Sequence, residues 1–143
     1  MRVLRWILVL CGIALFAYSF TLPAVKEANA AATATGMIGY KCATLTLLVP
    51  WGKDGFQMLR DSPLQYVSIL LSGWINPVFL IALVLAMIRP RLRASLTLSM
   101  VTTAMFVFCW IVFSQLKLHP MAGYWMWMAG ILLALYSNLL AAK

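Results

Sequence analysis

Two long stretches of the chain contain no charged residue, and a short arginine-rich segment separates them. The first covers residues 65–88 and the second covers residues 94–116. Each exceeds the roughly 20 apolar residues that an α-helix needs to cross about 30 Å of bilayer hydrocarbon. Buried helices of soluble proteins are rarely apolar on every side over such a length. The pattern predicts two transmembrane helices, at about residues 64–88 and 94–115.

Two further apolar stretches, residues 5–22 and 121–140, lie near the ends of the sequence. Pro120 suits the first turn of a helix that begins after it. With these two spans, the four stretches predict an all-α fold. The expected architecture is a single domain over residues 1–143, formed by a four-helix transmembrane bundle.

The first apolar stretch has a second interpretation, as a secretory signal peptide. Residues 28–30 have the A-x-A pattern of a cleavage site. The motif lies well beyond the apolar core, however, and Pro23, Lys26 and Glu27 come between them. Retention as the first span is the favoured interpretation, and cleavage after Ala30 stays open.

The loop at residues 24–63 is the longest segment between predicted spans. Residues 37–49 form an apolar run within it that is too short to cross a bilayer. We expect a short interfacial helix in this outer loop, and a strand over residues 44–49 is the alternative. Residues 53–55 are typical of a turn, and Pro63 favours the start of the next helix.

The composition agrees with a membrane location. The chain of 143 residues is 64% hydrophobic and only 10% charged, well outside the usual range of soluble domains. A net charge of +8 would suggest nucleic-acid binding in a soluble protein. Here the positive residues flank the apolar stretches, where topology explains them. We therefore expect the lipid bilayer as a partner, and no nucleic acid.

Arg89, Arg91 and Arg93 lie between the two long stretches and are the expected topology determinants. Short loops rich in arginine tend to remain in the cytoplasm. The loop at residues 24–63, which holds all three acidic residues, then lies on the opposite side. The expected location is the bacterial inner membrane, multi-pass, with both termini cytoplasmic. The same side would hold the remaining flanking cations Arg2, Arg5 and Lys143.

A polar cluster is expected inside the bundle. Ser72 and Asn76 share one face of the second span, and Thr102 and Thr103 lie at a similar depth in the third. Because an unpaired amide at mid-span is costly, Asn76 should face the bundle, beside Thr102 or Thr103. Hydrogen bonding between helices is the favoured role, and a polar site on a solute path is the alternative. Pro77 should bend the helix here.

The sequence offers little chemistry for catalysis or metal binding. His119 has no second histidine or carboxylate at ligand spacing, so no metal is expected. Cys11, Cys42 and Cys109 form no C-x-x-C motif, and only Cys42 is expected outside the membrane, on the side where disulfides form. No nucleophile–base set or phosphate-binding loop is present. We predict no catalytic residue and no cofactor.

The last apolar stretch opens with residues 123–127, which are rich in aromatic side chains. An aromatic belt at the outer membrane interface is the favoured interpretation, and a ligand-stacking site is the alternative. Further along, Gly130, Ala134 and Asn138 recur every four residues, which favours close packing against another helix.

Four short motifs give the chain a wider resemblance. It resembles a group of small bacterial four-span inner-membrane proteins over most of its length. The resemblance implies the four-span fold and no particular activity. The motifs are Leu22-Pro23-Ala24, Gly39-Tyr40-Lys41-Cys42, Asn76-Pro77 and Gly123-Tyr124-Trp125-Met126-Trp127.

These observations favour a non-enzymatic role. The leading hypothesis is an accessory or assembly partner in the inner membrane, bound to another membrane protein or to a second copy of itself. A small transporter of a neutral or apolar solute is the first alternative, because Asn76 and Pro77 lie at mid-span. A thiol-redox protein that uses Cys42 is the second alternative.

Overall fold

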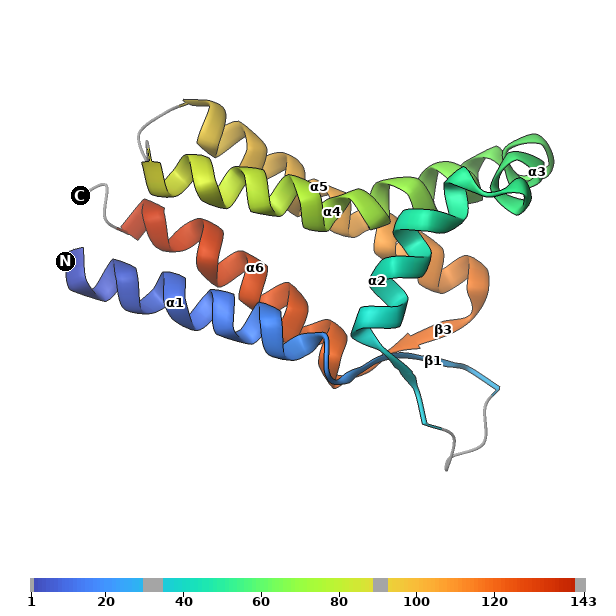
Figure 1. Cartoon of the computed structure of the whole chain (residues 1–143), viewed down its shortest axis with the longest axis horizontal. Coiled ribbons are helices and arrows are strands. Elements are labelled where there is room, and N and C mark those ends of the chain that lie inside the picture. The colour runs from blue at the N-terminus through green and yellow to red at the C-terminus, as the bar shows by residue number, and fades with distance from the viewer. Residues whose placement is uncertain (1, 30–34, 89–92, 141–143) are drawn as a thin grey trace.

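Two antiparallel pairs of helices form most of the chain. The computed structural model describes residues 2–29, 35–88 and 93–140, and these residues are mostly helical. Figure 1 shows α1 alongside α6 and α4 alongside α5. The described residues form α1 (Arg2–Ser19), β1 (Pro23–Glu27), β2 (Met37–Ile38), α2 (Gly39–Leu48), the 3-10 helix η1 (Val49–Trp51), α3 (Lys53–Asp61), α4 (Pro63–Ile88), α5 (Arg93–Leu116), β3 (Leu118–Pro120) and α6 (Ala122–Leu140).

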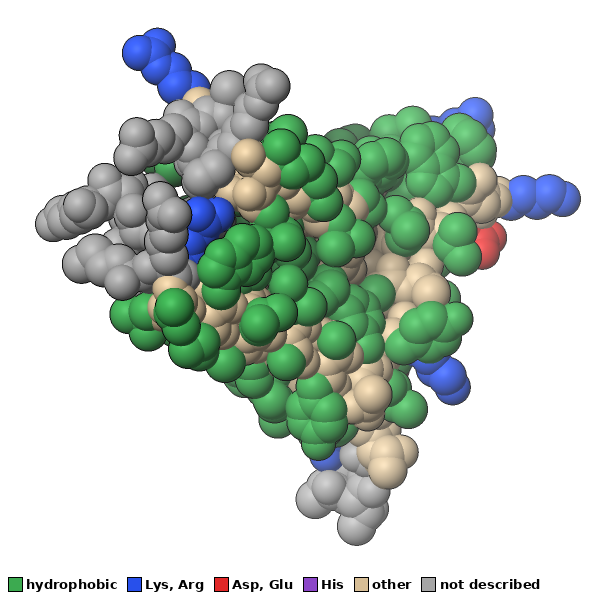
Figure 2. Space-filling view, turned by 60° about the vertical axis from the view of Figure 1, so that its left-hand side comes forward, with side chains coloured by type: hydrophobic (Ala, Val, Ile, Leu, Met, Phe, Trp, Pro, Cys, Tyr) green, Lys and Arg blue, Asp and Glu red, His purple; other side chains and the backbone are tan. Residues whose placement is uncertain are grey.

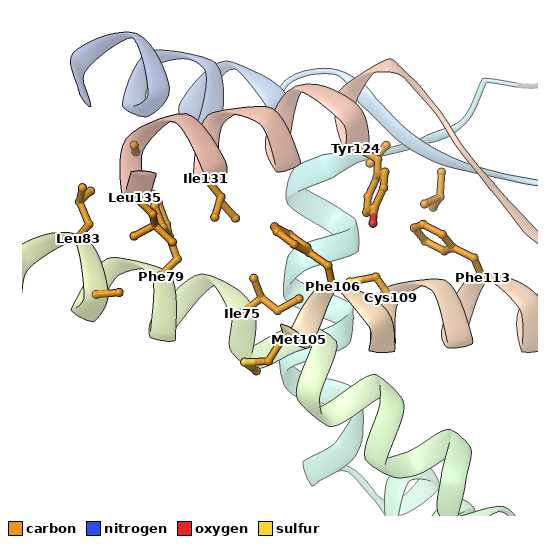
Figure 3. Packing of buried hydrophobic residues seen from close by; sticks show 14 of the residues in the cluster. Ile75, Phe79, Leu83, Met105, Phe106, Cys109, Phe113, Tyr124, Ile131 and Leu135 are labelled. Carbon is orange, nitrogen blue, oxygen red and sulfur yellow. The ribbon is translucent and has the colours of Figure 1, made fainter. Parts of the chain in front are cut away.

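The two pairs pack on each other through large apolar side chains. Ile75, Phe79 and Ile131 are fully buried, and Figure 3 shows them pointing into the space between α4 and α6. The rings of Phe16 on α1 and Phe79 on α4 lie 4.8 Å apart. Spacings of three or four residues place such side chains on one stripe of each helix, and this stripe forms the core.

Glycines bring α1 and α6 close together. A Cβ atom added to Gly130 would lie 2.6 Å from the backbone nitrogen of Phe16 and 2.8 Å from the carbonyl oxygen of Gly12. A Cβ atom added to Gly12 would lie 2.6 Å from the backbone nitrogen of Ala134. The predicted small-residue face is thus an interface with α1 at Gly130 and Ala134. The side chain of Asn138 lies outside the described part.

Two helices in the described part of the chain are long and apolar enough to cross a membrane, judged by length and composition. They are α4 with 26 residues and α5 with 24 residues, which match the two predicted long spans. The prediction of four such helices is confirmed for these two only. α1 has 18 residues and α6 has 19, or about 27–29 Å of helix, and α1 ends early because Pro23 begins β1.

The all-α prediction is wrong for the segments that join the helices. β1 is the middle strand of a small antiparallel sheet in the order β2-β1-β3, with Val25 opposite both Met37 and Pro120. Backbone groups between helices need hydrogen-bond partners, and the sheet supplies them. Strands of two to five residues are too short for an alternating pattern to reveal them.

The loop between α1 and α4 holds more structure than predicted. The expected short helix exists as α2, and the alternative strand over residues 44–49 is wrong. Residues 53–55 were expected to form a turn, but they begin α3. Asp54 in the first turn and Arg60 in the last turn of α3 have the signs that the helix dipole favours, which explains a helix in this polar segment.

The predicted positive side corresponds to one end of the molecule. The start of α1, the end of α4, the start of α5 and the end of α6 lie together, with the sheet and α3 at the other end (Figure 1). Nη2 of Arg5 donates a hydrogen bond to the carbonyl oxygen of Ala86, at 3.2 Å. Arg93 is exposed at the start of α5, while Arg89 and Arg91 lie outside the described residues.

Candidate functional site

A cleft of about 1060 Å³ lies between α2, β1 and the neighbouring parts of α4, α5 and α6. Most of the side chains that face it are apolar. Polar side chains interrupt this surface mainly on β1, α2 and α4. The principal lining residues are Cys42, Leu45 and Thr46 of α2, Ile69, Ser72 and Asn76 of α4, Cys109, Val112 and Phe113 of α5, and Tyr124 and Trp127 of α6.

α2 forms one wall of the cleft because it packs directly on α4 at a glycine. A Cβ atom added to Gly73 would overlap the carbonyl oxygen of Thr46 and lie 2.7 Å from its carbonyl carbon. Gly73 is buried, so the two backbones touch at this point. The absence of a side chain at Gly73 therefore sets the position of α2 and the width of the cleft.

The side-chain amide of Asn76 lies in the cleft. Nε1 of Trp127 donates a hydrogen bond to Oδ1 of Asn76, at 2.8 Å. The indole nitrogen can only donate, so the amide oxygen must face Trp127 and Nδ2 must face away. Within the described part of the chain, Nδ2 has no hydrogen-bond partner. The half-buried Asn76 thus offers a donor that the protein does not use.

The predicted polar cluster is divided between two places. Ser72 and Asn76 both line the cleft, and the Ser72 hydroxyl donates to the carbonyl oxygen of Ile69, at 2.9 Å. Thr102 and Thr103 do not line it. Their hydroxyls donate to carbonyl oxygens four residues earlier in α5, the nearest acceptors for short side chains.

Thr103 also joins α5 to α6. Its hydroxyl lies 2.8 Å from Oη of Tyr136, within hydrogen-bond distance. This contact between helices is of the kind expected for the polar cluster, but its partner is Tyr136. Tyr136 and Trp127 could not be predicted as partners from the sequence, because both contacts depend on how α6 is rotated against the other helices.

The aromatic residues at the start of α6 point mainly inward. Tyr124 is 5% exposed, whereas Trp125 is 45% exposed. The Tyr124 ring lies 4.8 Å from that of Phe113 and 5.6 Å from that of Trp127. Tyr124 and Trp127 are three residues apart and therefore share a helix face. This spacing of three residues is the feature of the sequence that indicates a shared inward face for Tyr124 and Trp127 and a different face for Trp125.

The hydroxyl of Tyr124 is buried without a partner. Figure 3 shows it pointing from α6 toward α5, between Cys109 and Phe113. Oη makes no hydrogen bond with the described residues and is covered by its neighbours. A buried polar atom without a partner costs roughly 1–3 kcal/mol and calls for an explanation. Tyr124 lines the cleft, but its hydroxyl is not open to it.

Cys42 and Cys109 line the same cleft, although they form no motif in the sequence. Both are free thiols, with Cys109 buried and Cys42 partly buried. Burial raises the pKa of the Cys42 thiol above its ordinary value. Because the thiolate is the reactive form, Cys42 is poorly suited to act as a nucleophile at neutral pH.

Cys42 should therefore react slowly with a maleimide at neutral pH, and its rate should continue to increase at high pH. The comparison is the exposed thiol introduced by Lys41→Cys in a Cys42→Ser background, whose rate should level off at a lower pH. The measurement is the labelling rate against pH, read by peptide mass. Equal rates for the two thiols at pH 7 would contradict the burial of Cys42.

Charged residues lie along the cleft where β1 and the start of α2 meet. They are Lys26, Glu27 and Lys41, and Lys41 and Glu27 are exposed. Within the described ranges, no three His, Cys, Asp or Glu side chains are grouped closely enough to hold a metal ion. The arrangement is suited to holding an apolar molecule, with an amide as its central polar contact.

All four short motifs from the sequence contribute residues to the cleft, namely Ala24, Gly39, Lys41, Cys42, Asn76, Gly123, Tyr124 and Trp127. Gly123 also allows close packing, since an added Cβ would lie 2.8 Å from the carbonyl oxygen of Pro23. Segments far apart in the sequence thus meet at one place.

No protein-family model, curated protein or solved structure matches the chain.

Proposed function

We propose that this chain is a non-enzymatic integral membrane protein that binds a neutral, mostly apolar molecule in the cleft. The observation that carries the proposal is the cleft itself. It is large, its wall is mainly apolar, and it holds the amide of Asn76. Ligand pockets commonly combine an apolar lining with a few polar groups that fix orientation. Pro77 follows Asn76 within α4. A proline at this position in the helix favours transport of the bound molecule as the function of the site.

Exposed apolar side chains support a bilayer as the surroundings. In the most apolar stretch of each long helix, less than half of the residues are buried. The buried share is 44% in α4 and 39% in α5. Large side chains such as Leu80, Val84 and Met100 are at least half exposed. Figure 2 shows hydrophobic side chains over the middle of one face, with Lys and Arg at its margins. Apolar surface of this extent is unfavourable in water and suits lipid.

The proposal includes α1 and α6 as spans beside α4 and α5. Both lie along the other pair in Figure 1, and α1 exposes Val3 (73%) and Leu10 (61%). Their lengths fall only slightly short of about 30 Å, a mismatch that a bilayer accommodates by local thinning. The first span would be retained, because cleavage after Ala30 would remove α1 and the middle strand of the sheet.

Both termini and the arginine-rich segment should lie in the cytoplasm. The basis is that the starts of α1 and α5, which carry Arg5 and Arg93, lie at one end of the helices (Figure 1). β1 and α3, which carry Glu27, Asp54 and Asp61, lie toward the other end. Reporters inserted between Arg91 and Leu92 and after Gly52 should report opposite compartments, and a reporter after Lys143 should agree with the first. Two reporters on one side, or a protein that is soluble without detergent, would contradict the spans.

Binding in the cleft can be tested with a photoreactive amino acid at Leu45, which lines the cleft. A matched substitution at Leu80, which is absent from the cleft lining and half exposed, is the control. In membranes, position 45 should form an adduct of one defined small mass, whereas position 80 should give only a mixture of bulk-lipid adducts. The same mixture at both positions would contradict binding.

An accessory role toward another membrane protein is the second candidate function. The exposed apolar side chains of α2 and α3 favour it, with Leu48 65% exposed and Phe56 62% exposed. These residues lie outside the two long helices, where a partner could cover them. A protein-sized adduct from a photoreactive amino acid at Leu48, in place of lipid adducts alone, would support this candidate.

A further inference from the structure

The cleft presents a hydrogen-bond donor without a matching acceptor. Nδ2 of Asn76 has no partner among the described residues, and its Oδ1 is already bonded to Trp127. The hydroxyl of Tyr124 also lacks a partner, but its neighbours cover it, so Asn76 supplies the donor that a ligand can reach. A ligand that fits this site therefore brings an acceptor oxygen.

The acceptor should be uncharged. The residues around Asn76 that line the cleft are Ser72, Cys109, Tyr124 and Trp127, none of which carries a positive charge. A buried carboxylate or phosphate without a paired cation would be costly. The charged residues of the cleft, Lys26, Glu27 and Lys41, lie apart from this group, on β1 and at the start of α2.

The rest of the ligand should be apolar and long. The cleft volume of about 1060 Å³ lies at the upper end of the range for sites that hold drug-sized molecules. Its walls on α2, η1 and α5 include Leu45, Val49 and Val112. Exposed apolar side chains on the neighbouring helices, such as Trp110, place the cleft beside the proposed bilayer, from which an apolar molecule can enter.

Resting on the proposed function, we infer that the ligand is a neutral acyl ester whose carbonyl oxygen accepts a hydrogen bond from Nδ2 of Asn76. The acyl chain lies along the apolar wall of the cleft. The Trp127 indole holds the amide in the orientation that presents this donor. Trp127 is thus a positioning residue, and Asn76 makes the contact that distinguishes an ester from a plain hydrocarbon.

The test measures how well three probes protect Cys42 from maleimide in vesicles of a single phosphatidylcholine. The probes are methyl palmitate, the hydrocarbon heptadecane and ionised palmitic acid at pH 8. Methyl palmitate should half-protect Cys42 at about a threefold to tenfold lower mole fraction than heptadecane, the value of one hydrogen bond. Ionised palmitic acid should protect less well than methyl palmitate.

Two variants separate the ligand contact from the internal hydrogen bond. Asn76→Leu and Trp127→Phe both remove the bond between these residues, but only Asn76→Leu removes the amide. Asn76→Leu should abolish the preference for methyl palmitate over heptadecane. Trp127→Phe keeps the amide but no longer holds its orientation, so it should reduce the preference only in part. Tyr124→Phe removes only a hydroxyl that its neighbours cover, so it should leave the preference unchanged, and loss of the preference in this variant would overturn Asn76 as the donor.

The outcomes distinguish the two levels of the proposal. If no probe protects Cys42, binding in the cleft fails and the proposed function fails with it. If heptadecane protects as well as methyl palmitate in the unaltered protein, the cleft binds apolar molecules but the ester inference is overturned. That comparison needs no variant, so it holds even if Asn76→Leu does not fold.

Discussion

Replacing Gly130 with alanine should force α1 and α6 apart and destabilise the chain by about 2 kcal/mol, in the range measured for overpacked interiors. The added methyl group would meet the backbone of Gly12 and Phe16 at 2.6–2.8 Å, and backbone atoms cannot turn aside as a flexible side chain can. Alanine favours helix over glycine by roughly 1 kcal/mol, which offsets part of the loss. The loss should still exceed this gain, because α1 contributes to the core through Val9 and Phe16.

The measurement is the midpoint of unfolding in detergent, followed by circular dichroism or by loss of the monodisperse peak on heating. Gly52→Ala is the matched control, since an added Cβ there meets only the carbonyl oxygen of Val49, at an ordinary 3.5 Å. Gly52→Ala should shift the midpoint little. A Gly130→Ala protein as stable as the control would mean that α1 and α6 are not packed as described.

The sequence predicts well those helices that depend on one local property, the length of a run of apolar residues. The start of α4 at Pro63 and the end of α5 at Leu116 each lie one residue from the predicted bounds of 64 and 115, because continuous apolar runs end at charged or proline residues. α2 was also predicted, from an apolar run too short to cross a bilayer. In each case the local composition was sufficient, and no distant contact was needed.

The elements that depend on distant partners could not be predicted. β1 pairs with strands that lie later in the chain, and its five residues carry no periodic signal. α3 looked like a turn because Gly55 disfavours helix. Gly55 is buried, and an added Cβ would overlap the carbonyl oxygens of Val49 and Pro50. Close packing therefore outweighs helix propensity at this position.

The candidate site was predicted in part for the same reason. Ser72 and Asn76 could be placed on one helix face from their spacing, and both line the cleft. Their partners could not be found, since Trp127 lies 51 residues along the chain and its position depends on the rotation of α6. The cleft itself exists only because α2 crosses α4, and Gly73 was the sole local sign of that crossing.

Replacing Gly73 with alanine should release α2 from α4 and open the cleft without unfolding the four long helices. The added methyl group would overlap the Thr46 carbonyl, and overpacking of this kind costs roughly 1–3 kcal/mol. Cys42 on α2 should then be exposed more often, and its labelling should accelerate by about tenfold, since 1.4 kcal/mol corresponds to a factor of ten. Gly52→Ala adds a single methyl group beyond the end of α2, between η1 and α3, and should leave the rate unchanged. An unchanged rate in the Gly73→Ala protein, with its unfolding midpoint also unchanged, would show that α2 does not rest on α4 through Gly73, and the cleft would then lose the wall that defines it.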